Sequence, residues 1–151
     1  MSKIIEEFLN DLKDLNKLKK NEVVLKALKV KENSYSPYSH FRVGAALLFK
    51  DGNVLTGVNV ENASFGLSNC AERSVIFESI GKGYKKEDIL ALVVSSDSNI
   101  PASPCGACRQ VISELLPLDT PVICVSSQGT IAKYNVQELL PFGFSSEQLG
   151  N

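Results

Sequence analysis

One stretch of the sequence, ILALVVSS at residues 89–96, decides the fold. Its nearly unbroken, Val-rich apolar run predicts a central strand that is buried on both faces. A helix is predicted before it, at about residues 70–80, and ends at Gly81. Another helix is predicted after it, at residues 105–116, and is ended by a proline. Because helices alternate with a buried strand, we expect a sheet covered by helices on both faces.

Two hairpins supply the remaining strands. RVGAALLF (42–49) and NVLTGVNV (53–60) are separated by a turn at Asp51-Gly52, and Gly tolerates the positive φ that such turns need. PVICVSS (121–127) and TIAKY (130–134) are joined by an equally short turn. Turns this short permit only antiparallel pairing. We therefore predict an α/β fold: a three-layer α/β/α sandwich around a five-stranded mixed sheet.

Helices are also predicted at the two ends of the chain. Residues 3–18 carry apolar side chains at spacings of three and four, and residues 21–33 continue in a second amphipathic helix. Mixed charges occupy their other positions, so we expect these helices to cover one face of the sheet and to expose the charges. A last short helix is predicted at residues 135–140, with Asn135 as its N-cap.

Composition and charge disfavour several classes of protein. The chain has 151 residues, of which 44% are hydrophobic and 22% charged, and this suits one globular domain. Its 16 Lys and Arg are balanced by 17 Asp and Glu, so a nucleic-acid partner is disfavoured. The N-terminus lacks the apolar core of a signal peptide, and no apolar run could span a membrane. We therefore expect no membrane partner and a cytoplasmic location, where cysteines more often bind metals than form disulfides.

Three of the four cysteines lie at predicted helix starts. Cys105 and Cys108 stand at i and i+3, on one helical face, where two thiolates can bind the same ion. Cys70 begins the preceding helix. The helix dipole lowers the pKa of thiols at these positions, and Zn²⁺ prefers such soft ligands. We predict that these three cysteines form a zinc site.

A tetrahedral zinc ion needs a fourth ligand, and two interpretations compete. A fourth protein ligand would make the site structural, whereas a water molecule would leave it open for catalysis. Cys124 lies inside the predicted strand PVICV, where a role in the core is favoured. His40 has no second ligand at a suitable spacing. The open, catalytic site is therefore the favoured interpretation.

Glu72 and two arginines complete the expected site. Glu72 follows Cys70 by two residues and does not share its helical face, so it can hold water at the open side of the metal and act as a proton carrier. A surface glutamate favoured by the helix dipole is the alternative. Three thiolates outweigh the charge of Zn²⁺. Arg73 and Arg109 are placed to offset this excess by donating hydrogen bonds to thiolate sulfur.

These residues match a known family. C-A-E (70–72) with P-C-x-x-C (104–108) is the pattern of zinc nucleobase deaminases, with Cys in place of the usual His. The chain resembles the small, homotetrameric cytidine deaminases with an all-Cys zinc site, in which active sites are completed by neighbouring subunits. Further matching segments are YSPYSHFRVGAAL (35–47), NVENAS (59–64), NCAERS (69–74), SPCGACRQVISEL (103–115) and ELLPFGF (138–144). The resemblance implies one Zn²⁺ per subunit and hydrolytic deamination of cytidine and deoxycytidine to uridine and deoxyuridine, as in pyrimidine salvage.

The resemblance also implies a role for each matching residue. The three clustered cysteines correspond to the zinc ligands and the Glu of C-A-E to the acid/base. Phe41 corresponds to the aromatic residue that packs on the pyrimidine, and Asn59 and Glu61 to the pair that binds the ribose 3′-hydroxyl. The backbone N–H of Ala71 corresponds to the donor to the base O2. Phe144 corresponds to an aromatic residue that reaches into the site of a neighbouring subunit.

The chain departs from the family pattern at two places. Phe65 stands where many relatives have Tyr, so any role of that hydroxyl is absent. Residues 1–19 extend beyond the usual family start, and we divide the chain into this extra amphipathic helix and a single domain at residues 20–151. The alternatives are a deaminase of a related nucleoside analogue or of RNA, and a non-catalytic structural zinc protein. The near-neutral charge disfavours RNA, and the pair Asn59 and Glu61 favours a free nucleoside.

Overall fold

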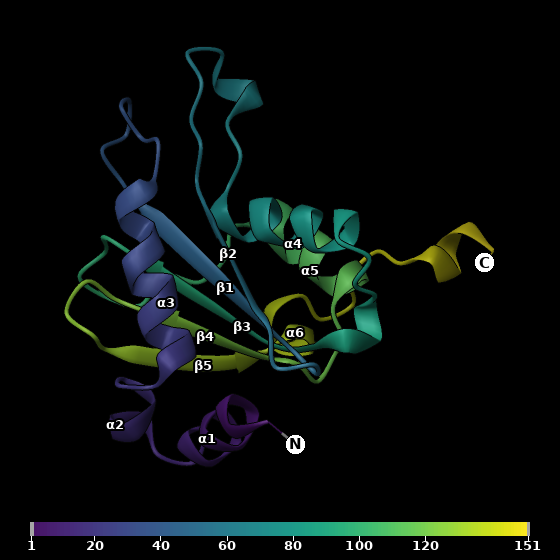
Figure 1. Cartoon of the computed structure of the whole chain (residues 1–151). Coiled ribbons are helices and arrows are strands. Elements are labelled where there is room, and N and C mark those ends of the chain that lie inside the picture. The colour runs from purple at the N-terminus through teal and green to yellow at the C-terminus, as the bar shows by residue number, and fades with distance from the viewer. Residues whose placement is uncertain (1, 151) are drawn as a thin grey trace.

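A computed structural model describes residues 2–150 and contains one mixed sheet with helices on both faces (Figure 1). The strands are β1 (Val43–Phe49), β2 (Val54–Val58), β3 (Ile89–Ser96), β4 (Pro121–Val125) and β5 (Ile131–Asn135). The α-helices are α1 (Lys3–Asp11), α2 (Leu15–Leu18), α3 (Glu22–Val30), α4 (Ala71–Gly81), α5 (Gly106–Leu115) and α6 (Val136–Leu139). The predicted five-stranded α/β fold is confirmed.

The sheet has the strand order β2-β1-β3-β4-β5. Both predicted hairpins form: β1 pairs antiparallel with β2, and β4 pairs antiparallel with β5. β3 lies at the centre, antiparallel to β1 and parallel to β4. Most of its residues are buried, as expected for a strand covered on both faces. The mixed character of the sheet therefore comes from β3, which joins the two hairpins.

Two hydrophobic layers hold the helices on the sheet. On one face, α4 and α5 bury Val75, Ile76 and Ile112 against inward-facing residues of all the inner strands. On the other face, α3 packs together with the N-terminal helices, which bury Ile5 and Phe8 (Figure 1). The N-terminal helices thus share a core with the rest of the chain. The division of the chain at residue 19 stays a prediction.

The predicted helix at residues 3–18 is wrong in one respect, because it is broken into α1 and α2. The Asp14 side chain accepts a hydrogen bond from the backbone N–H of Asn16, at 2.9 Å. Asp14 is therefore the N-cap of a new helix and not an interior residue of a long one. The break lets Leu18, like Phe8, reach the core.

Two glycines allow helices to lie unusually close to the sheet. A Cβ atom on Gly44 of β1 would lie 2.4 Å from the carbonyl oxygen of Ala27 in α3. A Cβ atom on Gly57 of β2 would lie 2.9 Å from the backbone nitrogen of Val75 in α4. Side chains at these positions would push both helices outward. The close approach at Gly57 fixes α4, whose N-terminus carries Cys70, against the sheet.

Two segments extend away from the layers. The loop between β2 and α4 carries a short 3-10 helix, Phe65–Leu67, and projects from the sheet (Figure 1). The C-terminal segment after α6 ends in another 3-10 helix, Ser146–Leu149, which also stands apart (Figure 1). Over residues 2–150, none of the helices combines the length and apolar character that crossing a membrane requires.

Candidate active site

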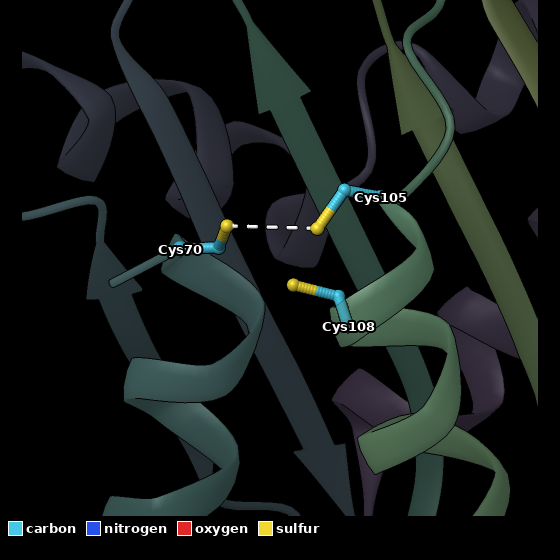
Figure 2. Close-up of side chains that lie close together, drawn as sticks. All are labelled: Cys70, Cys105 and Cys108. Atoms are coloured by element: carbon cyan, nitrogen blue, oxygen red, sulfur yellow. Dashed lines mark hydrogen bonds between the residues drawn. The ribbon is translucent and has the colours of Figure 1, made fainter. Parts of the chain in front are cut away.

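Three cysteine sulfurs meet between the N-termini of two adjacent helices. Cys70 is the N-cap of α4, Cys105 is the N-cap of α5, and Cys108 lies in the first turn of α5. Their Sγ atoms lie within 4.8 Å of one another. Figure 2 shows the three side chains pointing toward one common point, with Cys70 Sγ and Cys105 Sγ 3.8 Å apart. The helix starts predicted from the sequence therefore bring these sulfurs together.

The donor set fits zinc. Two sulfurs bound at about 2.3 Å to a tetrahedral ion lie about 3.8 Å apart, which matches the separation of Cys70 and Cys105. Thiolates favour zinc over harder ions such as Mg²⁺ and Ca²⁺, which prefer oxygen ligands. Among residues 2–150, this trio is the only group of three or more His, Cys, Asp or Glu side chains that could hold an ion. Neither Cys124 nor His40 belongs to it, so a protein group as fourth ligand finds no support.

Cys124 is a core residue in this structure. It is fully buried in β4 and belongs to the same hydrophobic layer as Val75 and Ile112. Burial raises the pKa of its thiol to about 12. A thiol with so high a pKa stays protonated and is a poor zinc ligand.

Glu72 lies beside the sulfur cluster and is almost fully buried, with 5% of its surface exposed. The Cys108 thiol donates a hydrogen bond to Glu72 Oε2 at 3.1 Å. Burial raises the pKa of this carboxyl group above its ordinary value. Glu72 is therefore not a solvent-exposed residue at a helix start, and this removes the alternative interpretation of a surface glutamate.

Charged and polar neighbours stabilise the Cys70 thiolate. A hydrogen bond with Cys108 is the largest cause that lowers the pKa of Cys70, and the nearby Arg73 guanidinium adds to it, so that the pKa falls to about 5. Arg73 Nη2 donates to Cys70 Sγ at 3.3 Å. Arg73 thus occupies the position that its i+3 spacing from Cys70 predicts.

The same expectation is wrong for Arg109. Its guanidinium donates to the carbonyl oxygens of Pro104 at 2.7 Å and Leu139 at 2.9 Å, and to Ser103 Oγ at 2.7 Å. Residue i+1 on a helix points away from residue i, so Arg109 faces away from the sulfur of Cys108. It ties the loop before α5 to the end of α6.

A cavity of about 470 Å³ opens beside the cysteines and joins the distant sequence motifs. This size lies within the roughly 300–1,000 Å³ of small-molecule pockets. The lining residues predicted from the sequence are Phe41, Asn59, Glu61, Cys70, Glu72 and Cys105. The lining residues without a sequence prediction include Val43, Val94, Ser96, Ala102 and Ser103. A signal for part of this set existed, because ligands of α/β proteins gather at the carboxyl ends of strands, where Val94 and Ser96 lie.

Hydrogen bonds fix two polar residues of the cavity lining, Asn59 and Glu61. Asn59 Oδ1 accepts from the backbone N–H of Val43 at 2.9 Å, and its Nδ2 donates to the carbonyl oxygen of Phe41 at 2.8 Å. One Nδ2 hydrogen then remains for a ligand. Glu61 accepts hydrogen bonds from Ser39 Oγ and the backbone N–H of Ser39, and the Ser39 hydroxyl lowers the pKa of Glu61. Glu61 therefore offers an ionised acceptor in the lining of the cavity.

Two further predicted residues stand outside the cavity lining. The side chain of Phe144 is 56% exposed, and its carbonyl oxygen accepts a hydrogen bond from Gln110 Nε2 at 2.9 Å. Ala71 is the first residue of α4, and its side chain is buried in the core. As the first helical residue, Ala71 has a backbone N–H without an intrahelical acceptor.

Comparisons with known proteins agree with this geometry. The family described as "Cytidine and deoxycytidylate deaminase zinc-binding region" matches residues 18–124. The chain is 47% identical over 129 residues to a cytidine deaminase of Halalkalibacterium halodurans, covering 85% of this chain and 96% of that protein. It is 42% identical to a cytidine deaminase of Sporosarcina psychrophila, covering 85% and 93% of the two chains. A crystal structure of cytidine deaminase from Burkholderia pseudomallei is 43% identical, with a TM-score of 0.79, and covers 81% of this chain and 96% of that one.

Proposed function

Because the chain belongs to the cytidine and deoxycytidylate deaminase family, we propose that Glu72 carries the protons of the reaction and that the cavity binds a free nucleoside. The reaction is the zinc-dependent hydrolytic deamination of cytidine, in which water replaces the exocyclic amino group and ammonia leaves. We extend it to deoxycytidine, because Asn59 and Glu61 offer one donor and one acceptor, which a single sugar hydroxyl can satisfy.

The metal and its ligands have separate tasks. When Cys70, Cys105 and Cys108 hold it, Zn²⁺ supplies the Lewis acidity that makes water a nucleophile near neutral pH. The thiolates bring excess negative charge to this position. We infer that Arg73 offsets that charge, and the hydrogen bond to Cys70 supports this role.

The burial of Glu72 is the observation that carries its proposed role. Burial raises the pKa of the Glu72 carboxyl group, which makes its carboxylate a stronger proton acceptor than an exposed one. In the proposed sequence, Glu72 accepts a proton from the attacking water and delivers it to the adjacent ring nitrogen. It then transfers the second water proton to the departing amine, so one proton stays on uridine and the other leaves with ammonia.

The cavity walls account for recognition of an uncharged nucleoside. Phe41 offers a flat apolar face to the pyrimidine. The free Nδ2 hydrogen of Asn59 and the carboxylate of Glu61 provide one donor and one acceptor for a ribose hydroxyl. The unpaired helical N–H of Ala71 is the proposed donor to the base O2.

We also propose that the enzyme acts in the cytoplasm as a homotetramer whose sites are completed by neighbouring subunits. The tetramer is supported by the exposure of large apolar side chains on the two projecting segments (Figure 1). Phe65 and Leu67 are 76% and 71% exposed, and Phe142 and Phe144 are also largely exposed. Such clusters on a protein surface mark interaction sites. Phe144 is the residue that we expect to reach a neighbouring cavity.

Product analysis tests the proposed function. Purified, zinc-loaded enzyme should convert cytidine to equal amounts of uridine and ammonia, and should leave an oligonucleotide that contains cytidine nearly unchanged. The cavity lining includes the Glu61 carboxylate, which repels the phosphates of a polynucleotide. Turnover of the oligonucleotide at the rate of free cytidine would overturn the assignment to a free nucleoside.

A further inference from the structure

One carboxylate outside the cavity joins the two chain segments that form its wall. Asp97 directly follows β3, and Arg42 directly precedes β1. Asp97 Oδ2 accepts from both the backbone N–H and Nε of Arg42, each at 2.9 Å, and Oδ1 accepts from Arg42 Nη2 at 3.2 Å. The backbone N–H of Asp97 donates in turn to the carbonyl oxygen of Arg42 at 3.1 Å. Side chain and backbone thus continue the pairing of β1 with β3 beyond the end of the sheet.

A second cation, Lys31 at the end of α3, contacts the same carboxylate. Lys31 Nζ lies 3.0 Å from Asp97 Oδ1 and donates to the carbonyl oxygen of Ser96 at 3.4 Å. Lys31 is buried, with only 8% of its surface exposed. Two cations therefore share one acceptor, and their hydrogen bonds hold the pKa of Asp97 well below its ordinary range. Burying a lysine without an ion-pair partner costs free energy of folding. Loss of the Asp97 carboxylate would leave Lys31 buried without that partner.

The residues that Asp97 holds line the cavity. Phe41 and Val43, on either side of Arg42, both belong to the lining, and so does Ser96 beside Asp97. The backbone leading to Phe41 is strained, because His40 has a φ of +57°, in the left-handed region. Such a conformation persists only where surrounding contacts impose it. Within the turn, the His40 N–H donates to the Ser36 carbonyl oxygen and the Phe41 N–H to Ser39 Oγ, each at 3.0 Å. Directly after the turn, Asp97 holds Arg42 and Asn59 holds the Phe41 carbonyl.

We propose that Asp97 is a positioning residue for the nucleoside: it holds the chain at Arg42, directly after the strained turn at His40, so that the ring of Phe41 stands against the base. The proposal rests on the proposed role of Phe41. Asp97 belongs neither to the cavity lining nor to the cysteine cluster, so it acts on binding and not on proton transfer. Its loss should therefore raise KM for cytidine and leave kcat nearly unchanged.

Substitution of Asp97 by the isosteric Asn tests this inference. Asn lacks the charge that holds Arg42 and Lys31, so in zinc-loaded Asp97→Asn we expect KM for cytidine to rise about tenfold and kcat to change less than about threefold. Asp51→Asn is the matched control, because Asp51 also accepts hydrogen bonds from backbone and side chains but lies in the turn between β1 and β2, outside the cavity lining. The KM of the Asp51→Asn enzyme should equal that of the wild type. Equal KM values in the Asp97 variant and the wild type, or a fall in kcat alone, would overturn the proposal.

A double-mutant cycle shows whether Asp97 acts through Phe41. In a Phe41→Leu background, where the aromatic face is already lost, Asp97→Asn should raise KM less than about twofold further. An undiminished tenfold effect there would mean that Asp97 acts by another route, and the proposal would be wrong. If Asp97→Asn does not fold, Arg42→Gln removes the side-chain half of the link from an exposed residue and should raise KM in the same way. A wild-type enzyme that does not deaminate cytidine would instead refute the proposed function.

Discussion

Cys108 Sγ lies 3.1 Å from Oε2 of Glu72, between the N-termini of two helices that are distant in sequence. The sulfur cluster and the buried carboxyl group are therefore direct neighbours and not separate features. Packing of α4 beside α5 creates this contact, and the close approach of α4 to β2 at Gly57 supports it. The contact places Glu72, the proposed proton carrier, next to a cysteine of the metal-binding cluster.

The hydrogen bond from Arg73 to Cys70 predicts a change in turnover without loss of metal. Arg73→Ala leaves the excess thiolate charge uncompensated, so kcat should fall about tenfold while each chain retains one zinc ion. Steady-state kinetics and a metal count on the same sample measure the two effects. Arg73→Lys keeps the charge and should recover part of the loss. Release of zinc from Arg73→Ala would show that Arg73 holds the site together and does more than adjust its charge.

The two classes of cysteine predict opposite results on substitution. Cys105→Ser removes a sulfur from the cluster, so we expect zinc content and activity to fall together. Cys124→Ala removes a thiol buried in the core, and should retain zinc and activity while lowering the free energy of unfolding by about 1 kcal/mol. Metal analysis and thermal unfolding of both variants measure the difference. Zinc loss from the Cys124 variant would restore the interpretation of a four-cysteine structural site.

The local signals of the sequence predicted most of the sheet and the metal cluster. The apolar run at residues 89–96 and the Asp51-Gly52 turn act over a few neighbours, and they identified β3 and the first hairpin. The cysteines at helix starts were equally visible, because Cys70 and Cys105 precede clear helical segments. These features depend on adjacent residues and needed no knowledge of packing.

Other contacts depend on packing and had no local signal. Lys31 and Asp97 belong to different elements, and only the assembled sheet brings them together. Arg109 adjoins Cys108 in sequence, yet the helix turns it toward Ser103 and the end of α6. The break between α1 and α2 arises because Asp14 caps the second helix, although the apolar spacing continues through it. In each case a tertiary or capping contact, and not the spacing of residues along the chain, decides the structure.

The ion pairs of Asp97 predict a pH-dependent contribution to stability. Its folded pKa lies below the unfolded value of about 4, so the contribution is present above that pH and is lost as the pH falls toward the folded pKa. Asp97→Asn should therefore lower the free energy of unfolding by about 2 kcal/mol at pH 7 and by much less near pH 2. Denaturant unfolding at both pH values measures it. A difference that does not shrink in acid would contradict the ionised state of Asp97.

The N-terminal helices predict an effect on stability that is separate from catalysis. Phe8 in α1 is fully buried in the core that α3 shares, so Phe8→Ala should lower the free energy of unfolding by about 3 kcal/mol. Its neighbour Leu9 is 39% exposed, and Leu9→Ala is the control that should change stability little. Neither variant should alter kcat at a temperature where it is folded. Equal stability of the two variants would show that α1 is an appendage and not part of the core.

Turnover of cytidine by Glu72→Gln, measured together with zinc content, tests the proposed mechanism most directly. Gln keeps the shape of the side chain but cannot carry a proton, and it leaves the three sulfurs in place. We predict one zinc ion per chain, as in the wild type, and a kcat for cytidine at least about 100-fold lower. A zinc-loaded Glu72→Gln enzyme with the kcat of the wild type would contradict the role of Glu72.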